Sequence, residues 1–169
     1  MKITTERVKE LRDQSGAGIM ECRNALVEAN DDMDKAVALL KERCLVKAEK
    51  KKGRAASQGL IEVYIHTGGR IAAMVELNCE SDFVARTDEF KALAHSLAMQ
   101  VAAMAPHYTS KEEVTEGATG VEPERDCLLL QPFIKDPTVT IQDVINQTIG
   151  KLGENIKVSR FTRFEVGDW

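Results

Sequence analysis

Apolar and polar side chains alternate along residues 61–77, and this pattern predicts a β-hairpin. The segment Thr67–Arg70 interrupts the alternation with two glycines, which favour a tight turn between strands. The second strand is expected to stop at Asn78, and Thr87 can cap a helix that follows it. Residues 78–86 should therefore form a short loop that is held at both ends.

This loop carries a large apolar ring, Phe83, beside a carboxylate, Asp82. A ring on an anchored loop can serve as a contact point for another protein. It can also pack inward as part of the core, and the spacing alone leaves both interpretations open.

The N-terminal part of the chain has apolar residues at helical spacing, which predicts three short helices. Thr4 or Thr5 can cap the first helix, and Ser15–Gly18 should break it. Asn30–Asp32 supplies a turn and a cap for the third. None is long enough to be stable alone, so they should pack into a small bundle. Their apolar positions are Val8, Leu11, Ile19, Cys22, Ala25, Leu26, Ala29, Met33, Ala36, Val37, Leu39 and Leu40.

A basic run, Lys47–Arg54, marks the expected boundary between an N-terminal module, residues 1–54, and a core domain, residues 55–169. The run could bind phosphates, but it lacks interleaved aromatic residues that would stack on bases. A solvated extension of the third helix into a linker is favoured instead.

The core domain should contain two longer helices and a last strand. A stripe from Phe90 to Met104 predicts one helix, and Thr140 can cap another that ends at Gly153. The region 107–136 predicts only one or two short helices. The predicted fold class is α+β, a three-helix module followed by a three-stranded antiparallel sheet packed by helices. In its last strand, one face is expected to hold Ile156, Val158, Phe164 and Val166, and the other Phe161.

Composition and charge narrow the class of function. The 169 residues are 43% hydrophobic and 30% charged, as in a soluble globular protein. The formal charge is +3 through Arg54, from 13 basic and 10 acidic residues, and −7 beyond it, from 10 basic and 17 acidic residues. The acidic part should repel a nucleic-acid backbone. No apolar run approaches the roughly 18 residues of a membrane span, so we expect a cytoplasmic protein.

The sequence contains no motif that indicates catalysis. Four scattered cysteines, expected to be buried thiols, lack the spacing of zinc ligands, and none of the three histidines stands at a telling spacing from a nucleophile or a second ligand. Glu80 and Asp82 lie two positions apart on a loop, which fixes no distance between their carboxylates and makes a hydrolase the weakest hypothesis. A binding protein without metal or cofactor is favoured over an enzyme.

Several motifs, in a fixed order, resemble the translation elongation factor Ts family. The similarity spans nearly the whole chain, with Ser81 where the family usually has threonine and Ile19 where methionine is common. The matching segments are Val8–Arg12, Ser15–Cys22, Tyr64–Arg70, Glu76–Arg86, Gln131–Pro137 and Arg163–Gly167.

The resemblance implies a guanine-nucleotide exchange factor for the GTPase elongation factor Tu. In the family, a ubiquitin-associated-like three-helix module docks on the GTPase, and a loop with Asp-Phe enters near its magnesium and phosphate site. Matched by motif, the module contacts would be Arg12, Ile19 and Met20. The intruding residues would be Asp82 and Phe83, flanked by Ser81 and Val84.

The resemblance also bears on assembly. Longer family members carry the core repeat twice and this chain carries it once, so a homodimer, giving a two-plus-two complex with the GTPase, is expected. Direct contact with nucleic acid or a membrane is not expected. An RNA- or ribosome-binding module that uses Lys47–Arg54 stays the main alternative.

Overall fold

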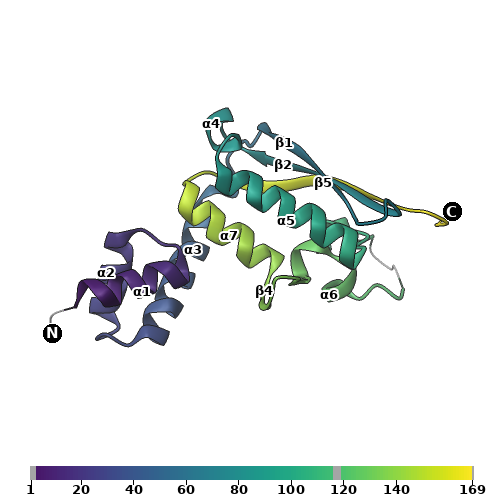
Figure 1. Ribbon diagram of the computed structural model, residues 1–169. Helices are drawn as coiled ribbons and strands as arrows, with labels where there is room; N and C mark the ends of the chain where they lie inside the picture. The colour runs from purple at the N-terminus through teal and green to yellow at the C-terminus, as the bar shows by residue number, and fades with distance from the viewer. Residues whose placement is uncertain (1–2, 116–118, 169) are drawn as a thin grey trace.

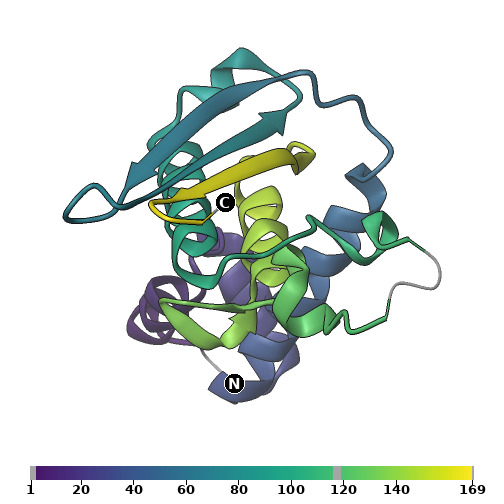
Figure 2. The same cartoon turned by 90° about the vertical axis from the view of Figure 1, so that its right-hand side faces the viewer.

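A three-stranded antiparallel sheet, covered on one face by helices, forms the larger part of the molecule (Figures 1 and 2). The computed structural model describes residues 3–115 and 119–168. The strands lie in the order β1 (Gln58–Ile65), β2 (Ile71–Cys79) and β5 (Ile156–Glu165). Two helices, α5 (Asp88–Met104) and α7 (Ile141–Leu152), pack against the sheet from one side. The α+β fold class and the three-stranded sheet are thus confirmed.

The N-terminal helices are α1 (Thr5–Ser15), α2 (Ile19–Glu28) and α3 (Met33–Lys51), as their apolar spacing predicted. The Thr4 side chain accepts a hydrogen bond from the first turn of α1, and Asp32 does the same for α3. Their stripes form an apolar cluster of their own, separate from the cluster under the sheet. The small bundle is therefore stabilised by mutual burial of short helices.

Helix α3 belongs to both clusters. Its first half packs against α1 and α2, whereas Ala48, near its end, is buried in the cluster under the sheet, where α3 packs along α7. A side chain at Gly150 of α7 would place its Cβ 2.8 Å from the Cys44 sulfur, so only glycine permits this close approach. As predicted, the basic run extends α3, as far as Lys51, and most of it is exposed; Ala48 is the buried residue of the run, and Lys51 Nζ donates to the Gly153 carbonyl.

The hairpin has the predicted turn, but β2 runs one residue beyond Asn78, to Cys79. One face of β2 is buried against α5 through Ala73, Val75, Leu77 and Cys79. The alternating Ile61, Val63 and Ile65 of β1 lie on the opposite face and are exposed. The sheet thus presents an apolar face that no helix covers within the described residues.

The last strand contradicts the prediction for its faces. Val158 pairs with Leu77 and Arg160 with Glu76, so Ser159 is an extra residue in the ladder. This bulge reverses the alternation, because side chains beyond it point to the other face. As a result Val158 is buried and Phe161 packs beside it, while Phe164 is 68% exposed on the outer face.

Between α5 and α7 the sequence predicted one or two short helices over 107–136; the described residues form short helical elements there and also a pair of short strands that was not predicted. These are the 3₁₀ turns η1 (Lys111–Glu113) and η2 (Leu128–Leu130), the helix α6 (Pro123–Asp126), and the two-stranded pair β3 (Pro132–Phe133) and β4 (Asp136–Thr140). The buried side chain of Gln100 joins this region to α5. Its amide nitrogen donates to Gln131 Oε1 and to the Pro132 carbonyl, both at 3.1 Å.

Substitution of Gly59 is expected to destabilise the hairpin strongly. Its φ of +151° lies in a region that other residues rarely adopt, and a Cβ there would meet the Leu77 carbonyl oxygen at 2.1 Å. Gly59→Ala should therefore lower the free energy of unfolding by about 2–4 kcal/mol. Gly53→Ala is the matched control, because nothing lies within 4 Å of that position. Equal urea midpoints for the two variants would contradict the argument.

Candidate functional site

The Asp82–Phe83 segment is a helical turn, where the sequence predicted a short loop held at both ends. It forms α4 (Asp82–Ala85), which projects from the end of the sheet opposite the hairpin turn (Figure 1). Ser81 caps it: the Ser81 hydroxyl accepts from the Val84 amide at 3.4 Å. Thr87 then caps α5 through the Phe90 amide at 3.2 Å, as predicted. The turn is thus fixed between a strand and a long helix.

Phe83 points away from the protein, and its exposed fraction is 78%. The next two residues do the opposite: Ala85 is buried and Val84 packs against the core. The interpretation of Phe83 as a core residue is therefore excluded. Beside it, the Asp82 carboxylate lies 2.7 Å from Arg86 one helical turn later. An exposed ring and a carboxylate together form the tip of a rigid projection.

Glu154, in the corner between α7 and β5, holds the base of this turn. One of its carboxylate oxygens accepts from the backbone amides of Glu80 at 3.1 Å and Ser81 at 2.9 Å. The other accepts from the Ser81 hydroxyl at 2.6 Å. Sequence reasoning did not single out Glu154, because no local spacing connects it with a residue 73 positions earlier.

Beneath the turn, Cys79 is buried, and its burial raises the pKa of the thiol, so it stays protonated at neutral pH. Burial likewise raises the pKa of Cys44 and Cys127. All four cysteines are free thiols, and Cys44 alone is only half-buried. Three of the four are buried, as expected, and the Cys79 sulfur also donates to the Ser81 carbonyl at 3.0 Å.

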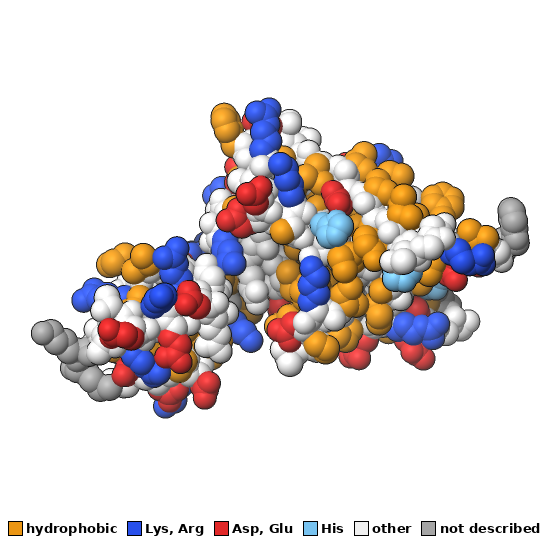
Figure 3. Space-filling model, viewed as in Figure 1, with side chains coloured by type: hydrophobic (Ala, Val, Ile, Leu, Met, Phe, Trp, Pro, Cys, Tyr) orange, Lys and Arg blue, Asp and Glu red, His pale blue; other side chains and the backbone are white. Residues whose placement is uncertain are grey.

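The second predicted contact lies on the N-terminal helices. Arg12 is exposed on α1, and Ile19 and Met20 begin α2 with exposed fractions of 56% and 60%. Lys47 of α3 donates to Glu21, which lowers the pKa of that carboxyl and ties the start of α2 to α3. In Figure 3 charged side chains of both signs crowd this part of the molecule. Two exposed apolar sites, on α2 and on α4, are thus both attached to the C-terminal half of α3, the first through Glu21 and Lys47 and the second through Lys51 and the residues that follow it.

A third exposed apolar surface is the outer face of the sheet. Cross-strand pairs place Val63 opposite Met74, and Ala72 opposite Phe164. We call this surface the outer sheet face; its large exposed side chains are Ile61, Val63, Ile65, Met74, Phe164 and Val166. The same face also carries Thr162 opposite Met74 and the Glu76–Arg160 ion pair at 2.7 Å, but so many exposed apolar side chains on three adjacent strands are unusual for a face in contact with water.

Comparison with known proteins decides the family. A family model described as Elongation factor TS matches residues 2–125. Elongation factor Ts of Carboxydothermus hydrogenoformans is 45% identical, over 98% of this chain and 90% of the relative. That of Heliobacterium modesticaldum is 46% identical, over 98% of this chain and 91% of the relative. The chain belongs to the elongation factor Ts family. This membership supports a role in translation elongation.

The elongation factor Ts relatives have more residues than this chain in the region that aligns with it. Their alignments run over 195 to 197 positions, although this chain has 169 residues. They therefore carry residues without a counterpart here. The segments that hold Asp82, Phe83, Ile19 and Met20 all lie within the part matched by the family model.

In this elongation factor Ts chain, two of the three histidines and the Glu80 carboxylate contact other groups of the protein. His95 contacts Glu62 at 2.8 Å, and His66 contacts the Tyr64 hydroxyl at 3.1 Å. The Glu80 carboxylate accepts from the Asn155 backbone amide at 2.6 Å and lies 3.6 Å from the Arg54 guanidinium, whereas Asp82 pairs with Arg86. Among residues 3–115 and 119–168 no cluster of acidic, histidine and cysteine residues could hold a metal ion.

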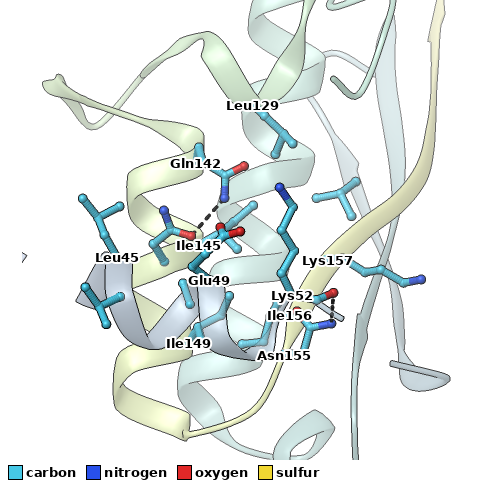
Figure 4. A pocket seen from close by; sticks show the side chains of 14 residues that line it. Leu45, Glu49, Lys52, Leu129, Gln142, Ile145, Ile149, Asn155, Ile156 and Lys157 are labelled. Atoms are coloured by element: carbon cyan, nitrogen blue, oxygen red, sulfur yellow. Dashed lines mark hydrogen bonds between the residues drawn. The ribbon is translucent and has the colours of Figure 1, made fainter. Parts of the chain in front are cut away.

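A groove of about 700 Å³ lies between α3, α7 and β5, with Leu129 at its edge (Figure 4). Its lining is mostly apolar, from residues such as Leu45, Ile145 and Ile149. Two of its amides are already bonded within the chain: Gln142 donates to Asn146, and Asn155 donates to the Lys52 carbonyl. The charged side chains of its lining are Glu49, Lys52 and Lys157, and no histidine or cysteine is among the lining residues. Among the helices of the described segments, none is long and apolar enough to cross a membrane.

Proposed function

We propose that this chain is a guanine-nucleotide exchange factor for the GTPase elongation factor Tu. The observation that carries the proposal is the exposed Phe83, held with Asp82 on a rigid turn in a member of the elongation factor Ts family. Asp82 and Phe83, flanked by Ser81 and Val84, would enter the magnesium and phosphate site of the GTPase. The chain would act in the cytoplasm, together with its partner.

The proposed mechanism is differential binding and requires no catalytic residue. The chain binds the nucleotide-free GTPase more tightly than the GDP-bound form, and by reciprocity it lowers the affinity for GDP by the same factor. Displacing groups around the magnesium ion and the phosphates removes favourable contacts to GDP. A turn that is already rigid loses little conformational entropy when it inserts.

Arg12, Ile19 and Met20 would supply affinity rather than nucleotide displacement. Their exposed side chains offer a guanidinium and two apolar groups to a helix of the GTPase. Because α3 packs on both the N-terminal bundle and α7, the two contacts can act as one binding surface. The RNA-binding alternative is less favoured than nucleotide exchange, because three residues of the basic run already contact groups within the chain. They are Lys47, Lys51 and Arg54.

We further propose that the chain forms a homodimer through the outer sheet face. Burying the apolar side chains of three strands against a second copy would remove them from water. Each dimer would then bind two GTPase molecules, one at each projecting turn.

The test is release of fluorescently labelled GDP from elongation factor Tu in excess unlabelled GDP. Substoichiometric amounts of this chain should accelerate release and turn over many GTPase molecules. Release that stays at the spontaneous rate even with excess chain would refute the exchange function. Adding RNA to the same assay should leave the rate unchanged, whereas inhibition by RNA would favour the RNA-binding alternative.

A further inference from the structure

The Asp82–Phe83 turn cannot maintain its geometry alone. Helix α4 has four residues, so it makes few internal hydrogen bonds, and the first amides of a helix have no partner within it. The direction of Phe83 therefore depends on what holds the backbone at Glu80 and Ser81.

Glu154 supplies much of that support through two contacts with this backbone and one with the Ser81 side chain, beside the hydrogen bond from Cys79 to the Ser81 carbonyl. It accepts from the amides of Glu80 and Ser81 and from the Ser81 hydroxyl, at 2.6 to 3.1 Å. Hydrogen bonds to a carboxylate are stronger than those between neutral groups. The hydroxyl contact would be available to threonine as well as to Ser81, so the departure from the usual family residue preserves it.

The segment before α4 also binds the corner that contains Glu154. The Glu80 carboxylate accepts from the Asn155 amide at 2.6 Å, next to Glu154 in the chain. Asn155 is buried, and its side chain donates to the carbonyls of Lys52 at 3.4 Å and Arg54 at 2.8 Å, just after α3 (Figure 4). The corner formed by Glu154 and Asn155, which holds the turn, is therefore itself bonded to the residues that follow α3.

We propose that Glu154 is a positioning residue for nucleotide exchange, which holds Ser81 so that α4 presents Asp82 and Phe83 in one orientation. It would act without touching the GTPase. This inference rests on the proposed exchange function, because orientation of the turn matters only if the turn enters the partner.

Glu154→Ala and Glu154→Gln test the proposal with a matched pair. Glu154→Ala should lower the maximal rate of GDP release about tenfold, and change the half-saturating concentration by less than about twofold, because the contacts of the N-terminal helices remain. Glu154→Gln should stay within about twofold of the parent, because its oxygen can accept from both amides and its NH₂ can donate to Ser81. Glu124→Ala, at an exposed residue of α6, is the control and should match the parent.

Hydrogen–deuterium exchange of the free protein provides a separate measurement. Amides of Ala85 and Arg86, which donate to Ser81 and Phe83 carbonyls, should exchange faster in Glu154→Ala, with amides in the middle of α5 unchanged. In a background with both Asp82→Ala and Phe83→Ala, Glu154→Ala should have no additional effect on GDP release. Unchanged amide exchange together with an unchanged maximal rate would overturn the positioning role. If the parent itself fails to release GDP, the exchange function fails, and the amide measurement still decides whether Glu154 orders the turn.

Discussion

Replacing both Asp82 and Phe83 by alanine is expected to slow the stimulated release of GDP from elongation factor Tu by about 100-fold. Phe83 is exposed and Asp82 contacts only Arg86 among the ion pairs of the described chain, so truncating them removes no part of the core. The loss should therefore appear as a lower maximal rate, with little change in thermal stability. Stopped-flow release of labelled GDP at several chain concentrations measures this rate.

Ile19→Asp in α2 is the informative control for that experiment. It places a charge on the other proposed contact and should raise the half-saturating concentration while leaving the maximal rate nearly unchanged. Circular dichroism melting curves should coincide for all three proteins. A double variant of Asp82 and Phe83 that releases GDP as fast as the parent would show that the turn is not the intruding element.

Placing two lysines on the outer sheet face, as Val63→Lys with Phe164→Lys, is expected to convert a dimer into a monomer. Both positions are exposed in the isolated chain, so the substitutions should be tolerated by the fold. In a sheet-to-sheet contact each ammonium group would be buried without a partner, and the dissociation constant should rise by at least about 100-fold. Sedimentation velocity at micromolar concentration distinguishes the two states.

Val27→Lys on α2 is the matched control, since Val27 is similarly exposed but lies outside the sheet. It should sediment like the parent. A parent that is monomeric at tens of micromolar would contradict the homodimer proposal itself, and would leave the apolar face without the proposed partner.

Sequence periodicity predicted the regular elements well because each depends on neighbouring residues. The caps at Thr4, Thr87 and Thr140 each act on an amide three residues later, so local sequence was enough to find them. The bulge at Ser159 was missed because it depends on how β5 pairs with β2. Alternation assumes constant pairing, so every face assignment beyond the bulge was reversed.

The candidate site was harder to predict because its geometry comes from distant residues. Whether Phe83 pointed inward depended on the burial of Val84 and Ala85 against the core, which spacing could not supply. The support from Glu154 joins residues that are far apart in the chain. The roles of the turn and of Arg12, Ile19 and Met20 came from the resemblance to a family.

Helix α3 fixes both the distance and the relative orientation of the two proposed contact sites, which lie on α2 and α4. It is continuous from Met33 to Lys51, with the N-terminal bundle at one end and, at the other, the corner that grips α4. One residue added to an α-helix turns everything beyond it by about 100° and moves it by about 1.5 Å. Because α3 packs against α1, α2 and α7, most of its faces are engaged, and a single residue inserted between Lys47 and Lys51 would aim α2 and Phe83 in different directions.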